Sequence, residues 1–541
     1  MAEEYDLIVL GGGHNGLTCA GLLAKAGWSV CVLERRHNIG GGCATEEVTL
    51  PGFKHNIHSQ GHVSINTGPI YKTLELEKHG VRYVHPDPTW ATVFKDKTGL
   101  LLCRSVDQTC DSIAQVSKKD AKTYRDFYNR FESLRQLYVA SWYSPPLPPS
   151  KIFSVLEGTR DGQLLLQMWN ASCKDIVNGF FESEKVKVWI MIISMQGGNL
   201  LDLYGVGAYI PILFTGMHTK PWGVCVGGSR QLAEGLQKAV EAAGGVVRKN
   251  AHVSKINVEN GRAVGVTLED GTFIKAKHAV ASNTNVKATF LDYVGEEHCD
   301  EEFLRMVRAY LPDEVAPFTP HFALNEAPQY LASKNCPDVQ KACFVGWGCE
   351  NLHEMQMHAN DIRVGIPSKI VPGCSISTTV HDPTQAPPGK HTAFVWQYAP
   401  FHLAEGGAER WASFKEEYGD HVQKVWCEYA PNMQGDNVLA RYCYSPLDIS
   451  RTTISMFEGS MNHGHCSPNQ MGIFRPFPGW SHYRMPIQGL YLVGSSAHPT
   501  GGVTGAPGFN AAGVIADDNK LTKWWWRPGK SYSTEPAGRR R

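Results

Sequence analysis

Two apolar runs and one helical pattern open the chain. Residues 7–10 are continuously apolar, as in a buried strand, and residues 28–33 form a second, mostly apolar run. Gly27 stands just before the second run, where a helix would end. Between the runs, apolar residues recur at the spacing of one helix face: Leu17, Ala20, Leu23 and Ala24. The pattern therefore predicts a strand, a helix and a second strand in one βαβ unit.

The turn between the first strand and the helix is rich in glycine. Gly11 suits a tight turn, Gly13 leaves room for a pyrophosphate, and Gly16 lets the helix pack closely on the sheet. Glu34 ends the second strand, close to the position about 20 residues on where a carboxylate binds a ribose hydroxyl. Together these features predict a dinucleotide-binding site at the helix N-terminus. A second glycine cluster, at residues 40–42, suggests backbone wrapping along a longer cofactor than NAD.

Helical and strand-like patterns divide the rest of the chain. Helical spacing is predicted for residues 117–141, 153–217 and 231–243, and the proline-rich residues 144–150 predict a boundary between lobes. Strand patterns occur at residues 246–249, 251–258, 262–268, 272–275, 278–282, 316–324, 374–380 and 392–398.

The last ordered pattern lies at residues 489–508. It predicts a buried strand, a glycine-rich loop and a helix that continues through Ala511, Ala512 and Ile515. A helix N-terminus approached through glycines is a second site for an anion or a polar ring.

Charge and cysteine content narrow the function classes. The 52 basic residues balance the 52 acidic ones, so no overall basic field favours nucleic acid. The 15 cysteines are scattered and form no C-x-x-C pair, which is typical of reduced thiols in an intracellular protein. The apolar residues 188–219 are interrupted by polar ones, and residues 1–4 resemble no signal peptide. We therefore expect a cytoplasmic protein.

Several motifs together resemble one flavoprotein superfamily. They are Gly-His-Asn-Gly-Leu at 13–17, Leu-Glu-Arg-Arg at 33–36, and Gly40-Gly41. The segment resembles the superfamily that contains phytoene desaturases, carotenoid ketolases, retinol saturases and the pyridine nucleotide-disulphide oxidoreductase domain-containing protein 2 group. The resemblance implies an α/β fold, in which an interleaved Rossmann-like FAD-binding domain (residues 1–70, 225–300 and 465–541) carries a mixed α/β substrate domain (residues 71–224 and 301–464).

The resemblance also implies which residues bind FAD. Val253 is expected to contact adenine through its backbone, and the block at 489–508 is expected to lie along the ribityl chain and the isoalloxazine ring. The full expected set is Gly11, Gly13, His14, Asn15, Gly16, Glu34, Arg35, Gly41, Gly42, Val253, Gly494, Ser495, Gly502, Val503 and Gly505.

Two histidines are candidate catalytic residues. The resemblance places His463 near the flavin, and His498 lies inside the C-terminal glycine-rich block at residues 489–508. For each histidine the alternative is a purely structural role in its loop. His463, His465 and Cys466 are too close together along the chain to converge easily on a metal ion, so no metal site is expected. No G-x-S-x-G elbow surrounds any serine, which disfavours a hydrolase.

The expected activity is hydride transfer from an apolar, isoprenoid-like small molecule to FAD, with oxygen or a quinone as the final acceptor. Three alternatives stay open: a retinol-saturase-like reductase, an amine oxidase, and a non-catalytic binder resembling Rab GDP-dissociation inhibitors.

The C-terminal tail indicates peripheral membrane contact. It contains Lys-Trp-Trp-Trp-Arg at residues 523–527 and ends in Arg539, Arg540 and Arg541. The competing interpretation is that the tryptophans cover the domain or a contact between protomers.

Overall fold

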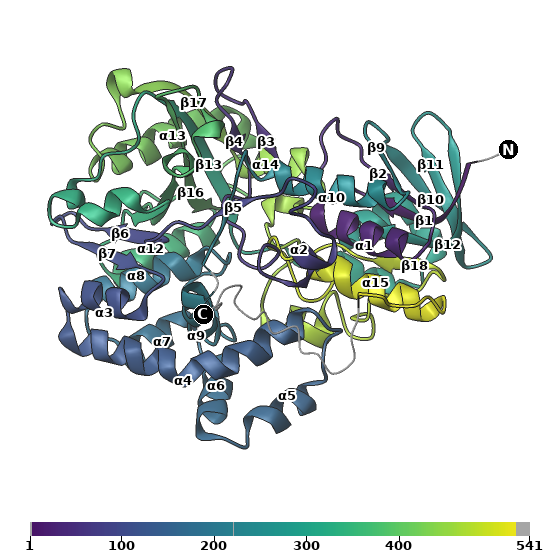
Figure 1. Ribbon diagram of the computed structural model, residues 1–541, viewed down its shortest axis with the longest axis horizontal. Helices are drawn as coiled ribbons and strands as arrows, with labels where there is room; N and C mark the ends of the chain where they lie inside the picture. The colour runs from purple at the N-terminus through teal and green to yellow at the C-terminus, as the bar shows by residue number, and fades with distance from the viewer. Residues whose placement is uncertain (1–2, 220, 526–541) are drawn as a thin grey trace.

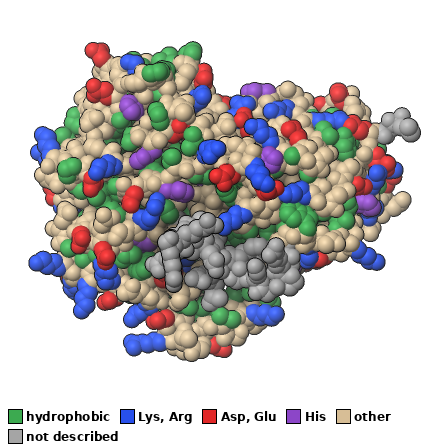
Figure 2. Space-filling view, in the orientation of Figure 1, with side chains coloured by type: hydrophobic (Ala, Val, Ile, Leu, Met, Phe, Trp, Pro, Cys, Tyr) green, Lys and Arg blue, Asp and Glu red, His purple; other side chains and the backbone are tan. Residues whose placement is uncertain are grey.

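The computed structural model describes residues 3–219 and 221–525, apart from the side chains of residues 136–139. Two large sheets lie side by side, each packed against helices, and a group of helices extends from the second sheet (Figure 1). On the face drawn in Figure 2, basic and acidic side chains are interspersed, in keeping with the balanced composition.

The first sheet is assembled from three distant parts of the chain. Its strands are β1 (Glu3–Leu10), β2 (Val30–Leu33), β9 (Val246–Arg248), β10 (Val253–Glu259), β11 (Arg262–Leu268), β12 (Phe273–Ser282) and β18 (Leu490–Leu492). Their order is β10-β11-β12-β1-β2-β9, and β18 pairs with the second half of β12. The five strands β18, β12, β1, β2 and β9 run parallel, so their carboxyl ends meet at one edge.

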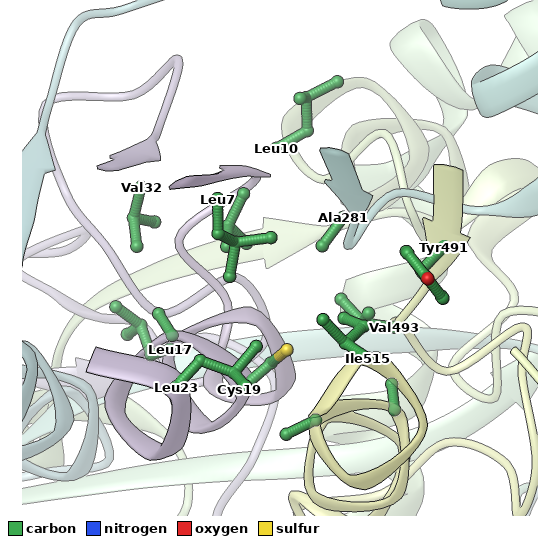
Figure 3. Packing of buried hydrophobic residues seen from close by; sticks show 14 of the residues in the cluster. Leu7, Leu10, Leu17, Cys19, Leu23, Val32, Ala281, Tyr491, Val493 and Ile515 are labelled. Carbon is green, nitrogen blue, oxygen red and sulfur yellow. The ribbon is translucent and has the colours of Figure 1, made fainter. Parts of the chain in front are cut away.

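Three helices accompany this sheet: α1 (His14–Lys25), α10 (Arg230–Ala242) and α15 (Ala506–Asp518). Figure 3 shows Leu17 and Leu23 of α1 and Ile515 of α15 directed toward the strands that carry Leu7 and Tyr491. The backbones of α1 and α15 approach very closely, since a Cβ added at Gly508 would lie 1.9 Å from the Asn15 carbonyl oxygen.

One strand differs from its sequence pattern. Residues 272–275 and 278–282 were predicted as separate strands, but β12 is a single strand of ten residues. Its pairing with β1 shifts between Tyr5↔Ala276 and Leu7↔Ala279, so β12 carries one extra residue at this point. This bulge interrupts the alternation of side chains without ending the strand.

The second sheet contains β6 (Trp90–Val93), β7 (Gly99–Leu102), β13 (Ala316–Leu324), β14 (Phe344–Trp347), β15 (Gly373–Ile376), β16 (His391–Ala399) and β17 (Val438–Tyr444). The order is β17-β13-β16-β15-β14-β6-β7, antiparallel except for β6 and β14. The structure confirms the predicted strands at 316–324 and 392–398. The strand predicted at 374–380 is shorter, because residues 378–380 form a 3-10 turn.

The two faces of the second sheet have different neighbours. One face packs on α13 (Trp411–Cys427) through Trp347 and Trp426. The other face, which carries Phe344 and Ile376, packs on the helical lobe. Helices of that lobe are α3 (Val106–Ala114), α4 (Lys118–Trp142), α5 (Pro149–Leu156), α6 (Arg160–Trp169), α7 (Cys173–Phe180), α8 (Glu184–Met195) and α9 (Tyr209–Thr219).

The helical predictions for this lobe are confirmed. Ser117 caps α4 by accepting a hydrogen bond from the Asp120 N–H. The proline-rich segment separates α4 from α5 within this lobe, so the predicted boundary between lobes does not lie there. No helix in the described part of the chain is both long and apolar enough to cross a bilayer.

The remaining elements are short strands β3 (Thr45–Glu46), β4 (His55–Asn56), β5 (Tyr83–Val84) and β8 (Val224–Cys225), and helices α2 (Pro69–Thr73), α11 (Glu301–Ala309), α12 (Leu352–Arg363) and α14 (Pro446–Thr452).

Candidate functional site

A cavity of about 850 Å³ begins at the carboxyl edge of the first sheet. Gly11 follows β1, Glu34 follows β2, Asn283 follows β12, and Ser495 lies just beyond β18; all four line the cavity. In open parallel sheets this edge is where ligands bind, because strand ends and helix N-termini converge there. The cavity then continues to the second sheet and the helical lobe, where Phe344 and Leu213 line it.

The first glycine cluster forms a turn with no room for side chains. Gly11 has a φ of +91°, in the left-handed region that glycine favours. A Cβ added at Gly16 would lie 2.5 Å from the Gly11 carbonyl oxygen, so the start of α1 lies directly on the end of β1. At Gly13 the nearest atom to an added Cβ would be the Asn283 side-chain nitrogen, at 2.9 Å.

Glu34 fastens the second strand to this turn. Its buried carboxylate accepts hydrogen bonds from the backbone N–H of Gly12 (2.8 Å) and of Arg36 (2.9 Å). The Arg35 guanidinium, which also lines the cavity, donates to the carbonyl oxygens of Arg451 and Thr452. Glu34 is the only carboxylate among the described residues that line the cavity.

Hydrogen bonds join the N-terminal glycine turn, residues 11–16, to the C-terminal glycine-rich loop in residues 489–508. The Asn15 Nδ2 donates to the Ser495 Oγ at 3.1 Å, and the His14 ring nitrogen Nε2 lies 3.2 Å from the Gly502 carbonyl oxygen. Burial lowers the pKa of His14 to about 4, so the ring is neutral near pH 7. The second glycine cluster adjoins the first, because the Gly40 N–H donates to the Gly12 carbonyl at 2.9 Å.

Most of the predicted cofactor residues line this one cavity. They are Gly11, Gly13, His14, Asn15, Glu34, Arg35, Gly41, Gly42, Val253, Ser495, Gly502 and Val503. Val253 opens β10 and lies near Ala251, whose N–H donates to the Glu34 carbonyl oxygen at 2.9 Å.

Three predicted residues lie off the cavity wall. Gly16 permits the contact between α1 and β1 described above. A Cβ at Gly494 would lie 3.1 Å from the carbonyl oxygens of Asn283 and Thr284, and one at Gly505 would lie 2.5 Å from Ile70 Cδ1. These glycines therefore allow close packing of the backbone, which explains why a glycine pattern alone cannot separate packing positions from lining positions.

Both candidate histidines line the cavity, and both are neutral near pH 7. Burial lowers the pKa of His463 to about 3 and that of His498 to about 4. The His463 residue adopts a left-handed conformation with φ of +55°, and its carbonyl oxygen accepts hydrogen bonds from Tyr310 and Ser496. The His498 Nε2 lies 3.1 Å from the Ser141 carbonyl oxygen. Within residues 3–219 and 221–525, no cluster of three or more His, Cys, Asp or Glu side chains is placed to hold a metal ion.

Sequence reasoning missed Asn283 and Arg475. The Asn283 Nδ2 donates to the Gly11 carbonyl at 3.0 Å, and its place directly after a buried strand is the signal that could have found it. Arg475 is fully buried and donates to the carbonyl oxygens of Asn462 (2.7 Å) and Ser495 (2.8 Å). It thereby holds the loop of His463 against the C-terminal glycine-rich loop, and nothing near it in the sequence indicates this role.

The far end of the cavity is apolar and aromatic. Phe344, Ile376 and Trp396 come from neighbouring strands of the second sheet and face the same side. Trp222 packs edge-on against Phe344, with ring centroids 5.0 Å apart. Such a wall holds a hydrophobic molecule with few directional contacts.

The residues at the sheet edge fit FAD. Glycine turns at 11–16 and 40–42 allow close approach of a diphosphate, and Glu34 offers a buried carboxylate at the position of a ribose. Asn15 Oδ1 is buried and has no hydrogen-bond partner among the described residues, so a polar group of the cofactor could satisfy it.

Comparison with known proteins identifies the family. The family model for an NAD(P)-binding Rossmann-like domain matches residues 9–75. A limonene dehydrogenase subunit of Castellaniella defragrans is 30% identical over 99% of both chains. The mouse pyridine nucleotide-disulfide oxidoreductase domain-containing protein 2 is 31% identical over 96% of this chain and 94% of its own. A lycopene-forming phytoene desaturase of Paracoccus is 26% identical over 93% of this chain and 95% of its own.

The chain belongs to the phytoene desaturase-like flavoproteins. Like them, it is an FAD-dependent oxidoreductase with a Rossmann-like domain. Among solved structures, an oxidoreductase from Methanosarcina mazei shares the fold, with a TM-score of 0.62 and 18% identity over 94% of this chain and 99% of its own.

The described part of the C-terminal tail packs on this phytoene desaturase-like core. Trp524 Nε1 donates to the Leu22 carbonyl at 3.2 Å, Lys25 lies 4.7 Å from the centre of the Trp524 ring, and Trp525 is buried. The rest of the predicted membrane segment, Trp526, Arg527 and Arg539 to Arg541, lies outside the described residues.

Proposed function

We propose that the protein is a dehydrogenase that introduces a double bond into an apolar, isoprenoid-like small molecule: a hydride from one carbon passes to FAD, and a proton from the neighbouring carbon passes to solvent. The observation that carries the proposal is the single cavity, which connects a dinucleotide end, at Gly13 and Glu34, with an aromatic end, at Phe344 and Trp396. Limonene dehydrogenase and phytoene desaturase are named for terpene substrates, and this supports the same substrate class here.

The side chains have positioning and exclusion roles in this reaction. When bound, FAD supplies the hydride acceptor. Gly13 and the start of α1 provide N–H groups for a diphosphate, and the aromatic wall orients the substrate and excludes water. His463 and His498 are neutral, so they contribute hydrogen bonds and shape and carry no charge near pH 7.

Amine oxidation is less well supported. A cationic amine is favoured by a nearby carboxylate, and the only carboxylate in the described cavity wall, Glu34, lies at the dinucleotide end. A reductase that transfers hydride from the flavin to the substrate would need the same cavity. The direction of hydride transfer is therefore tested by the experiment below.

Anaerobic flavin bleaching tests the function. The purified protein with bound FAD is mixed without oxygen with monocyclic terpenes, linear terpenes and primary amines, and absorbance near 450 nm is followed. We expect terpenes to bleach the flavin and amines to leave it oxidised. Bleaching by amines alone would establish an amine oxidase, and reoxidation of chemically reduced flavin by an unsaturated terpene would establish a reductase.

Substitution of His463 tests its place beside the flavin. His463→Ala is expected to slow flavin reduction by about 2- to 10-fold, the effect of one neutral hydrogen bond or contact, while the FAD content stays unchanged. Stopped-flow measurement of single-turnover reduction gives the rate. His353→Ala is the matched control, because His353 lies on α12 and does not line the cavity. Identical rates in both variants would assign His463 a purely structural role.

We also propose a cytoplasmic enzyme that makes peripheral contact with membranes, which suits collection of an apolar substrate from lipid. Three exposed apolar residues that line the cavity, Leu147, Phe153 and Val155, support such contact. The protein is expected to sediment with anionic liposomes, and less so in high salt or after truncation at Leu521. Equal sedimentation of the intact and truncated forms would exclude the tail as the anchor.

A further inference from the structure

Arg135 lies in the wall of the cavity without a matching acceptor among the described residues. It stands on α4, is only 7% exposed, and lines the cavity together with Leu134, Leu213 and Gly216. Its side chain packs on α9 where that helix has a glycine, since a Cβ added at Gly216 would lie 3.8 Å from Arg135 Cδ. The cation is therefore enclosed between two helices at the apolar end.

The hydrogen-bond donors of Arg135 are unused within the described part of the chain. Nε is buried and has no partner there, and the structure shows no hydrogen bond from either terminal nitrogen to a described residue. The nearest carboxylate oxygen belongs to Glu132 and lies 3.8 Å from Arg135 Nη2, beyond hydrogen-bonding distance. Burial lowers the pKa of Arg135, but a guanidinium stays protonated near pH 7.

Among the described residues of the cavity wall, none neutralises the positive charge of Arg135. The only carboxylate in the described cavity wall, Glu34, is at the dinucleotide end and accepts two backbone N–H groups. Lys151 on α5 is a further cation in the lining, in addition to Arg35 and Arg36. The ion pair with Glu132 is long, at 3.8 Å, and leaves the guanidinium N–H groups without an acceptor among the described residues. Buried donors without acceptors are unfavourable, and an oxyanion in the cavity would satisfy them.

We propose that Arg135 forms a subsite for an oxyanion at one end of the substrate. This inference rests on the proposed function and narrows its substrate class to an apolar chain or ring that carries a terminal carboxylate or phosphate. The guanidinium fork matches either group through two parallel hydrogen bonds. The apolar part of such a molecule packs on Phe344 and Trp396, and the anchored end determines which carbon can face the flavin.

The test compares ligands that differ only at the head group. Isothermal titration calorimetry on the protein with FAD bound measures the affinities of decanoate, decyl phosphate and decanol. Either anion is expected to bind about 10- to 100-fold more tightly than decanol, and comparison of the two anions identifies the head group. Arg135→Met is expected to remove this preference, whereas Arg135→Lys retains part of it.

A matched control comes from the same helix. Arg130 pairs with Asp161 at 3.1 Å, has a side chain that is 42% exposed, and does not line the cavity. Arg130→Met is expected to leave the preference for anions unchanged. Because Arg135 has no acceptor among the described residues, Arg135→Met is also expected to keep or raise the thermal midpoint, whereas loss of an arginine that stabilises the fold would lower it.

Two results overturn the subsite: equal affinities for anions and decanol in the unmodified protein, or an anion preference that persists in Arg135→Met. The proposed function fails separately. If the protein binds anions selectively but no terpene or terpenoid acid bleaches the flavin, the dehydrogenase proposal is contradicted and the anion subsite stands. If neutral terpenes bleach the flavin but the protein shows no preference for anions, the subsite is contradicted and the dehydrogenase proposal stands.

Discussion

Glu34→Ala is expected to weaken FAD binding by about 1.5 to 3 kcal/mol, or roughly 10- to 150-fold. The substitution removes a buried carboxylate at the position expected for the ribose contact. It also removes the acceptor of the Gly12 and Arg36 N–H groups, which hold the glycine turn next to the second strand. Fluorescence titration of the apoprotein with FAD measures the change.

The neighbouring Glu46 provides the control. Glu46 pairs with the Arg36 side chain at 2.6 Å but does not line the cavity. Glu46→Ala is therefore expected to change FAD affinity by less than about 3-fold, in line with a partly exposed ion pair. If both variants bind FAD as tightly as the unmodified protein, Glu34 does not contact the cofactor.

Arg475→Met is expected to cost about 3 to 5 kcal/mol of unfolding free energy, since several buried acceptors each lose about 1 to 3 kcal/mol, and to reduce the FAD retained on purification. The guanidinium is fully buried and donates to carbonyl oxygens in three segments, including those of Asn462, Gln470 and Ser495. Without it these acceptors stay buried and unpaired. The loss would also release the His463 loop from the C-terminal glycine-rich loop.

Urea unfolding, followed by circular dichroism and flavin release, measures this effect. Arg484→Met is the matched control, because Arg484 pairs with Asp518 at 2.7 Å and its side chain is 49% exposed. Its expected cost is below about 1 kcal/mol. Equal urea midpoints for the two variants would contradict the structural role of Arg475.

Local sequence patterns predicted helices and strands correctly where a few neighbouring residues determine the backbone conformation. The βαβ unit matches β1, α1 and β2 because apolar runs and helical spacing act over short distances. The helix predicted at 231–243 matches α10, and Gly244, with φ of +85°, follows it. The bulge in β12 was not predicted, because it depends on pairing with β1.

The candidate site was predicted in outline but its connections were not. The N-terminal glycine turn and the C-terminal glycine-rich loop are visible in the sequence, yet the bonds from Asn15 to Ser495 and from His14 to Gly502 follow only from the folded chain. The same glycine pattern includes Gly505, which permits packing against Ile70 and does not line the cavity.

By itself, then, the sequence determined the dinucleotide-binding unit, the family and some of the other helices and strands; it did not determine strands such as β14 and β17 of the second sheet. Glycine turns, strand runs and a terminal carboxylate impose steric and electrostatic requirements within a short stretch of chain. Only the tertiary structure decided that Arg475 joins two loops and that Arg135 faces the substrate end without an acceptor among the described residues. Burial and pairing depend on which distant segments pack around a side chain, and that information is not carried by spacing along the chain.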